Sequence, residues 1–173
     1  GEGAVDTPKD CPLRPKCDAS LPPLGTKRDF KHLGSKLAVA TGSPRHRGHD
    51  MFYKPGGKQW VIGKFAYGPE DKDLEDEEID VYLLRQCGST WEKIGTYRTS
   101  DTGQPSTLHA EEEGIPDTGG RMYVDFSSLS GGKPLDLGRH RIRMVVGGDL
   151  SGADDYIEVL PDKAQILVTD IDG

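Results

Sequence analysis

Two aspartates near the end of the sequence, Asp170 and Asp172, are the residues best placed for chemistry. They follow the apolar run Ile166 to Val168, which reads as a buried strand, in the pattern Asp-x-Asp-Gly. Carboxylates delivered past the end of a strand are suited to covalent or metal-assisted catalysis. The alternative is a polar strand end with a turn glycine, Gly173. Both interpretations stay open on these four residues.

A second candidate is an acidic block in which eight Asp and Glu residues lie between positions 70 and 80, with Lys72 as the counter-charge. Clustered carboxylate oxygens on a loop are the ligands that Ca²⁺ prefers. The spacing of Asp71, Asp73 and Glu75 makes these three residues candidate Ca²⁺ ligands. The block lacks the turn glycine and distal glutamate of an EF-hand. The alternative is a solvated acidic turn that discourages edge-to-edge pairing of sheets.

The three cysteines suggest redox chemistry. Cys11 and Cys17 are six positions apart and flanked by Pro12 and Pro15, a pattern that favours a small disulfide loop in an oxidising compartment. Cys87 is then expected to be a free thiol near a strand end. A zinc site needs four ligands, which Cys87 and scattered histidines poorly supply. The pairing favours an exported or extracellular protein over a cytoplasmic one.

Other constellations carry weaker signals. The sequence has no Gly-x-Ser-x-Gly nucleophile elbow. His46 and His49 lie on a Gly/Pro-rich loop, where we expect solvated side chains. The pair Asp154-Asp155 is predicted to form part of a hairpin turn. Six aromatic residues either fill the core or form a carbohydrate-stacking platform, with core filling the default: Trp60, Tyr67, Trp91, Tyr97, Tyr123 and Phe126.

Composition sets limits on the function. The 173 residues fit one domain, and 34% hydrophobic residues with 23 glycines indicate a loop-rich all-β protein. A net charge of −7 argues against nucleic-acid binding, because phosphate attraction needs an excess of Lys and Arg. The sequence contains no run of eighteen apolar residues and therefore predicts no transmembrane segment.

Short strand patterns separated by turn residues begin at Leu37. In the clearest ones, Ile79, Val81 and Leu83 alternate with polar residues, and so do Ile142 and Met144. Val81, Leu83, Ile142 and Met144 are therefore predicted core residues. The predicted strands span 37–41, 59–67, 79–85, 91–98, 107–111, 121–126, 139–146, 155–160 and 165–169.

Strands with one apolar and one polar face predict antiparallel sheets packed as a sandwich. We expect an immunoglobulin-like or C2-like β-sandwich of seven to nine strands over residues 37–173. Residues 1–36 are rich in Pro and Lys and lack periodicity, which predicts an irregular segment: a tether, or a flap over the core.

Three stretches resemble the region leading into lipin/LNS2-type domains: residues 63–77, residues 138–146 and the Asp-x-Asp-Gly tail. Such domains occur in lipin phosphatidate phosphatases and in membrane-associated phosphatidylinositol transfer proteins. The resemblance spans residues 63–173 and implies a β-sandwich beside a haloacid-dehalogenase-like phosphatase core. By that resemblance Asp170 matches the nucleophile and Asp172 the general acid/base, with Mg²⁺ between them.

The next family residue, usually Thr, and the later phosphatase motifs are missing from this sequence, so the resemblance implies no hydrolysis by this chain alone. The first expectation is therefore a non-catalytic accessory domain of a larger lipid-handling protein. Its partners would be a following phosphatase-like domain and acidic lipid, and Mg²⁺ would act only in a longer parent. The alternative is a free-standing exported module that binds Ca²⁺ or carbohydrate.

Overall fold

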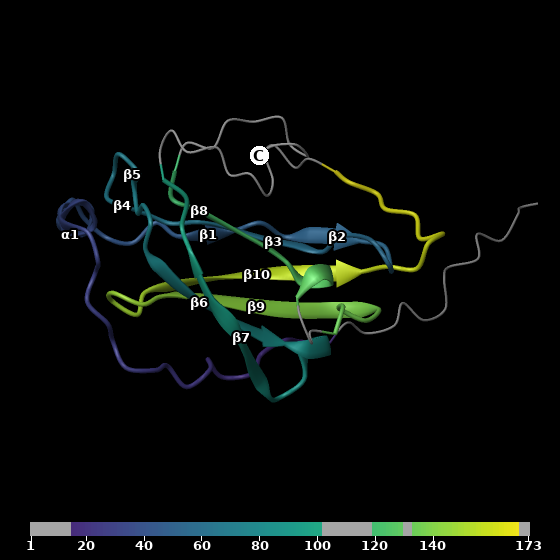
Figure 1. Ribbon diagram of the computed structural model, residues 1–173. Coiled ribbons are helices and arrows are strands. Elements are labelled where there is room, and N and C mark those ends of the chain that lie inside the picture. Colours follow the sequence, from purple (N-terminus) through teal and green to yellow (C-terminus); the bar gives the residue numbers. More distant parts are fainter. Residues whose placement is uncertain (1–14, 102–118, 130–132, 170–173) are drawn as a thin grey trace, which may run out of the picture.

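The computed structural model describes residues 15–101, 119–129 and 133–169. These residues form strands in three sheets, one α-helix and two short 3₁₀ helices (Figure 1). The predicted all-β sandwich is confirmed. It has ten strands in the described ranges, more than the seven to nine expected, and three of them are only two residues long.

The larger sheet has five strands in the order β2-β10-β9-β6-β7. Neighbouring strands run antiparallel, except that β2 lies parallel to β10. Its strands are β2 (Met51–Tyr53), β6 (Glu78–Leu84), β7 (Trp91–Arg98), β9 (Gly138–Val146) and β10 (Gly152–Val159).

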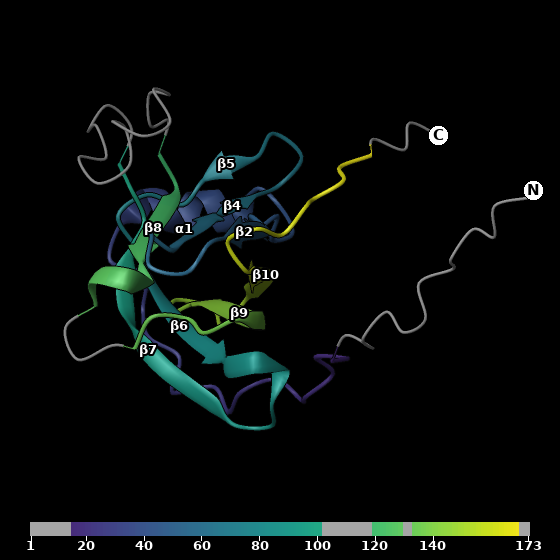
Figure 2. The ribbon, with the colours of Figure 1, turned by 90° about the vertical axis from the view of Figure 1, so that its right-hand side faces the viewer.

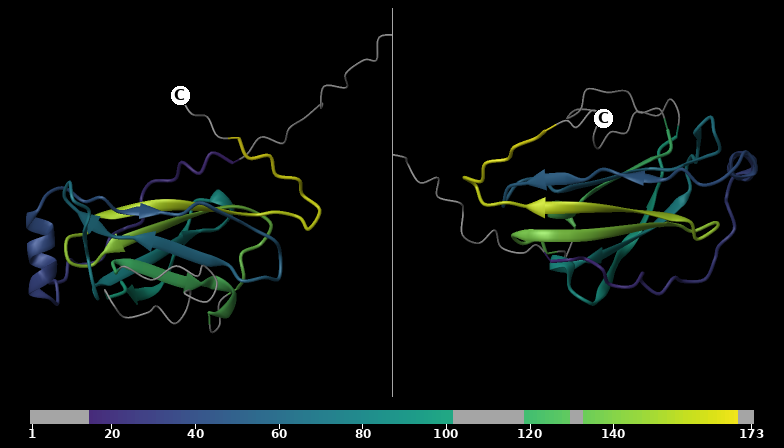
Figure 3. Two further views of the ribbon diagram at one scale, coloured as in Figure 1. Left: turned by 90° about the horizontal axis from the view of Figure 1, so that it is seen from above. Right: turned by 180° about the vertical axis from the view of Figure 1, so that it is seen from behind.

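A three-stranded antiparallel sheet forms the second layer and faces the larger sheet across the core (Figure 2). It contains β1 (Arg47–Gly48), β3 (Trp60–Lys64) and β8 (Arg121–Asp125). The small hairpin of β4 (Ala66–Tyr67) and β5 (Lys72–Asp73) lies beside helix α1 (Leu33–Ala40) at one end of the sandwich (Figure 3). The 3₁₀ helices are η1 (Arg85–Cys87) and η2 (Phe126–Ser128).

The core follows the predicted alternation. Val81, Leu83, Ile142 and Met144 are fully buried, as predicted, and pack with Val61 and other residues of the smaller sheet. The opposite face of β6 is not exposed to solvent, however. Asp80, Tyr82 and Leu84 on that face are also buried, because the segment before α1 covers them.

Two glycines allow the sheets to approach closely. A Cβ on Gly48 of β1 would lie 2.5 Å from the Cβ of Asp155, and one on Gly63 of β3 would lie 2.7 Å from the sulfur of Met144. Any larger side chain at either position would push the layers apart.

Two predicted strands are wrong. Residues 37–41 belong to the end of α1 and its C-cap Thr41, and residues 165–169 form no strand and are exposed. Helix α1 begins where it does because the buried Glu77 accepts hydrogen bonds from the backbone N–H groups of Lys31 and His32 and from Ser35 Oγ. These bonds satisfy donors at the helix start from Glu77, which immediately precedes β6 and is distant in sequence. The predicted strand over residues 107–111 lies outside the described residues.

The predicted pairing of Cys11 with Cys17 is also wrong: Cys17 forms its disulfide with Cys87, which is therefore not a free thiol. Cys11 lies outside the described residues. Proline-flanked spacing favoured the local loop, but residues 17–31 dock along β6 and bring Cys17 to η1 at its end. The Cα atoms of Cys17 and Cys87 are 4.5 Å apart, within the range that a disulfide requires.

Candidate functional site

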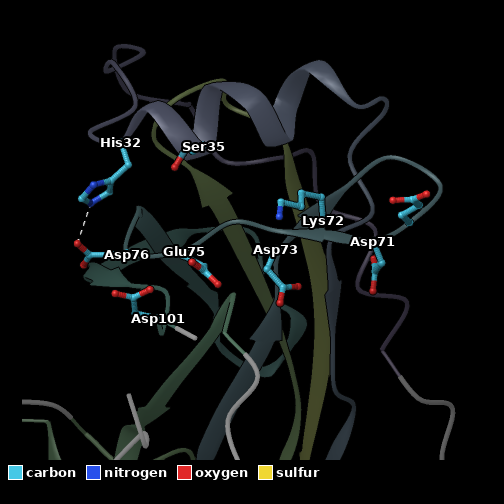
Figure 4. A pocket seen from close by; sticks show the side chains of 10 residues that line it. His32, Ser35, Asp71, Lys72, Asp73, Glu75, Asp76 and Asp101 are labelled. Atoms are coloured by element: carbon cyan, nitrogen blue, oxygen red, sulfur yellow. Dashed lines mark hydrogen bonds and ion pairs between the residues drawn. The ribbon is translucent and has the colours of Figure 1, made fainter. Parts of the chain in front are cut away.

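An acidic cavity of about 440 Å³ lies between α1 and the chain that leads through β5 to β6 (Figure 4). Residues of α1 and its N-cap form one wall, and the acidic block forms the other. The lining residues are His32, Gly34, Ser35, Glu70, Asp71, Lys72, Asp73, Glu75, Asp76 and Asp101.

Three of the six carboxylates that line the cavity, Asp71, Asp73 and Asp76, have cationic partners. Both oxygens of Asp71 accept hydrogen bonds from Arg47, at 2.9 and 2.6 Å, and Asp73 lies 2.6 Å from Lys64 Nζ. The hydrogen bonds from Arg47 outweigh desolvation and hold the pKa of Asp71 below its usual value. The cavity therefore carries less free negative charge than its composition suggests.

Asp76 is paired in the same way, from the side of α1. It accepts hydrogen bonds from Arg98 Nε at 2.6 Å and lies 2.8 Å from His32 Nε2. The hydrogen bond from Arg98 is the main cause of the lowered pKa of Asp76. The His32–Asp76 contact closes one end of the cavity (Figure 4).

The predicted calcium ligands lie along one wall of this cavity without forming a coordination sphere. Asp71, Asp73 and Glu75 are spread along it (Figure 4). Asp71 is paired with Arg47, and Asp73 is paired with Lys64. Within the described ranges, no three His, Cys, Asp or Glu side chains form a group that would hold a metal ion. Calcium binding here stays a prediction that this geometry does not support.

A second polar cluster, which the sequence did not predict, joins β1 and β4 to the β9–β10 hairpin. His46 Nε2 lies 2.8 Å from Ser151 Oγ, and Ser151 Oγ donates to Asp149 Oδ1. Tyr67 donates its hydroxyl hydrogen to the other oxygen of Asp149, at 2.7 Å. Burial is the main cause of the raised pKa of Tyr67. The expectation that His46 is solvated is thus wrong, because its ring packs against Phe65 and Tyr67.

The hydrogen-bond directions show that this Ser-His-Asp set is not a hydrolytic triad. The backbone N–H of Ala66 donates to His46 Nδ1, so the ring proton sits on Nε2 and points at Ser151. A general base would need a free lone pair there. Burial lowers the pKa of His46 to about 4, which keeps the ring neutral. The cluster therefore acts as a structural tie.

Asp155 is the one fully buried carboxyl on the core face of β10. Neither of its oxygens has a hydrogen-bond partner among the described residues. Burial, with the nearby charges of Asp50 and Asp154, raises its pKa well above the usual value. The interpretation of Asp154-Asp155 as turn residues is wrong, since both lie within β10; Asp154 faces the other way and pairs with Arg141 and Arg143.

The predicted catalytic pair, Asp170 and Asp172, lies outside the described residues. The apolar run before it is described: Ile166, Leu167 and Val168 are exposed, Leu167 to 89%. The sandwich thus does not use these residues in its own core. No helix in the described part of the chain has the length and apolarity needed to cross a membrane.

Several known proteins contain a region similar in sequence to this chain. Residues 44–116 match the family model described as PITM 1-3, beta-sandwich domain. Membrane-associated phosphatidylinositol transfer protein 2 of Mus musculus is 35% identical over 153 residues, which is 87% of this chain and 10% of that protein. Protein retinal degeneration B of Drosophila melanogaster is 26% identical over 160 residues, 91% of this chain and 11% of that protein.

The chain is thus a β-sandwich similar in sequence to a part of the membrane-associated phosphatidylinositol transfer proteins, and it spans about a tenth of their length. Among solved structures, the M1 domain from titin is similar at 14% identity with a TM-score of 0.30, over 72% of this chain and all of that domain. So loose a superposition supports no conclusion about function.

Proposed function

We propose that this chain is a non-catalytic accessory β-sandwich domain of a larger, lipin/LNS2-like lipid-handling protein. The observation that carries the proposal is the 35% identity to membrane-associated phosphatidylinositol transfer protein 2 over 87% of this chain but 10% of that relative. A stretch of this size and fold is one module among several. Its role is to position a neighbouring domain rather than to act on lipid itself.

The exposed tail supports this role. Ile166, Leu167 and Val168 form an apolar run of strand type, yet they lie outside the sandwich core. Exposed apolar residues in a row mark a surface that another element covers. We infer that the run is the first strand of a following phosphatase-like domain, in which Asp170 and Asp172 would be the nucleophile and the acid/base around Mg²⁺.

Hydrogen exchange tests the tail directly. Amides of residues 165–169 should exchange at least about tenfold more slowly in a parent protein extended past Gly173 than in this chain. Amides of the β10 core, near Ile157, serve as the internal control and should not differ. Equal, fast exchange of the tail in both proteins would contradict the proposed interface.

Activity tests the non-catalytic assignment. The 173-residue chain should release no phosphate from phosphatidate in the presence of Mg²⁺, because by the resemblance the other phosphate-binding and Mg²⁺-binding groups come from later motifs and not from the sandwich. In the extended parent, Asp170→Asn should abolish any such hydrolysis while leaving the fold intact. Hydrolysis by this chain, lost on Asp170→Asn, would show that the active site lies within it.

One observation favours membrane contact as a second role. Leu33 and Leu37, one helical turn apart on α1, are 73% and 62% exposed beside the exposed Lys36. Flotation with phosphatidylcholine vesicles containing phosphatidate should recover the chain, and Leu33→Asp with Leu37→Asp should release it. Lys36→Ala separates the apolar contribution from the charge. Failure of wild-type chain to float would remove this role.

The exported Ca²⁺- or carbohydrate-binding module is the weaker alternative. The comparisons lend no support to export, and the candidate carboxylates Asp71 and Asp73 already hold cations. Of the aromatic residues that might form a sugar platform, Trp60, Tyr67 and Phe126 are buried.

A further inference from the structure

Residues 17–31, which we call the strap, run along the outer face of β6, the face that points away from the smaller sheet (Figures 1 and 3). At the Leu84 end of β6, two side chains hold the first part of the strap. Arg141 Nη1 donates to the carbonyl oxygens of Cys17 and Ala19, both at 3.1 Å, and Trp91 Nε1 donates to that of Ser20 at 2.7 Å. Beyond these bonds, the Cys17–Cys87 disulfide fixes the same end covalently.

The other end of the strap is held by charge. Arg28 lies 3.0 Å from Asp80 and 2.9 Å from Glu78, while Lys31 lies 2.8 Å from Glu78. Although burial alone would raise the pKa of Asp80, hydrogen bonds from Thr96, Arg28 and Lys93 hold it below its usual value. The backbone N–H of Arg28 also donates to the carbonyl of Gly147. This half of the strap has no covalent link to the sheet.

Apolar surface of β6 lies under the first half of the strap. Leu84 is opposite Trp91 on β7 and Arg141 on β9, the two residues that hold the strap, so it lies directly under residues 17–20. Leu84 is fully buried and Tyr82, two positions before it, is 7% exposed. Lifting the first half of the strap would uncover both side chains.

We propose that the Cys17–Cys87 disulfide is a redox-controlled clasp that decides whether the first half of the strap covers this apolar face. A dithiol reductant breaks the S–S bond by thiolate attack and resolves the mixed disulfide with its second thiol. Cys17 and Cys87 gain two electrons and two protons and become thiols, while the dithiol is oxidised to its own disulfide. Cys87 is the less buried of the two cysteines, so its sulfur is the easier one to attack.

Reduction releases one half of the strap and not the other. Without the covalent link, residues 17–24 are held by the exposed bond from Trp91, with which water competes, and by the part-buried bonds from Arg141. Residues 28–31 keep their ion pairs with Asp80 and Glu78 and stay in place. The reduced protein then exposes Leu84 and Tyr82, and reoxidation covers them again. This inference does not depend on the proposed accessory role.

Hydrogen exchange followed by NMR before and after treatment with dithiothreitol tests the clasp. We expect the indole N–H of Trp91, which donates to the carbonyl of Ser20, to exchange at least about tenfold faster after reduction, while the backbone N–H of Arg28, which donates to Gly147, and the amides of β9 stay unchanged. Diamide reoxidation should restore the slow exchange. Equal exchange in both states overturns the proposal, and so does equal loosening of the whole sandwich, which would make the disulfide a global staple.

Two variants assign the effect to the right cysteines. Cys11→Ser should keep the full response to dithiothreitol, because Cys17 and Cys87 are untouched. Cys17→Ser should show fast exchange of the Trp91 indole N–H without reductant and no further response. If Cys17→Ser does not fold, the response of Cys11→Ser still decides the matter. A response lost in Cys11→Ser would show that the functional bond includes Cys11 and would refute the clasp.

Discussion

His46 Nε2 lies 2.8 Å from the Oγ of Ser151, a residue 105 positions further along the chain. This bond joins the segment before β1 to the turn of the β9–β10 hairpin. Through Ser151 it reaches Asp149, which also accepts the hydroxyl hydrogen of Tyr67. The tie thus connects both layers of the sandwich near the acidic cavity, and its stability and titration can be measured.

Removing one donor from this tie should weaken the fold. Tyr67→Phe keeps the buried ring but leaves one oxygen of Asp149 without its 2.7 Å hydrogen bond. We expect a loss of about 1–2 kcal/mol in the free energy of unfolding, measured by urea denaturation. Tyr156→Phe is the matched control, since the Tyr156 ring stacks under Arg139 near the surface. An unchanged midpoint for Tyr67→Phe would show that the bond contributes nothing.

The neutral state of His46 predicts an acid-sensitive contribution to stability. Burial lowers its pKa from 6.5 to about 4. Between these values the unfolded chain binds a proton at His46 that the folded chain does not, so stability falls as the pH drops from 6.5 toward 4. The loss should be on the order of 2 kcal/mol at pH 4.

The His46 contribution is the difference in pH dependence between the wild type and His46→Gln, because other carboxylates add their own slopes. An NMR titration of the ring gives the pKa independently. A midpoint near 6.5 would contradict the buried, neutral assignment.

Asp155 should have the opposite effect. Its folded pKa is raised, so its carboxyl favours folding fully below the unfolded pKa and loses that contribution as the pH rises through the folded value. Asp155→Asn removes the titration and should stabilise the protein at pH 7 by about 1–3 kcal/mol. The gain should vanish below about pH 4.

Asp154→Asn is the matched control for Asp155→Asn. It should destabilise the sandwich, because Asp154 pairs with Arg141 and Arg143 on the opposite face of β10. Destabilisation by Asp155→Asn at neutral pH would mean that the buried carboxyl has a partner and is not neutral.

The core prediction concerns Leu83, which is fully buried between the sheets. Leu83→Ala should cost about 2–4 kcal/mol through lost burial and the cavity left behind. Leu33→Ala removes the same atoms from a side chain that is 73% exposed and should stay within about 0.5 kcal/mol of wild type. A similar loss of unfolding free energy in the two variants would contradict the assignment of Leu83 to the core face of β6.

Calcium offers a test of the acidic cavity. We expect millimolar Ca²⁺ to leave the Tm of wild type unchanged, because Asp71 and Asp73 are neutralised by Arg47 and Lys64. Arg47→Ala frees Asp71 and is the variant most favourable to binding. A rise in Tm for wild type that Asp73→Asn abolishes would establish a calcium site despite these ion pairs.

The sequence by itself determined the fold class and the core of the larger sheet. Side chains on a strand alternate with period two, so polar neighbours in the sequence identify the residues that face the core. These are Val81, Leu83, Ile142 and Met144. The same local logic predicted an irregular segment before the sandwich, a tether or a flap, but did not predict that residues 17–31 are fixed along β6. The resemblance to the region leading into lipin/LNS2-type domains included the membrane-associated phosphatidylinositol transfer proteins, to which the chain is similar. Its lipin and phosphatase part stays a prediction.

Tertiary structure alone decided which distant residues meet. Cys17 pairs with Cys87 across 70 positions, and Glu77 fixes the start of α1 by accepting hydrogen bonds from Lys31 and His32. His46 finds Ser151 only because β1 and the β9–β10 hairpin lie together. Each of these contacts joins two segments whose local sequence carries no mark of the other. Periodicity reports the face of a strand, whereas such pairings depend on how the whole chain packs.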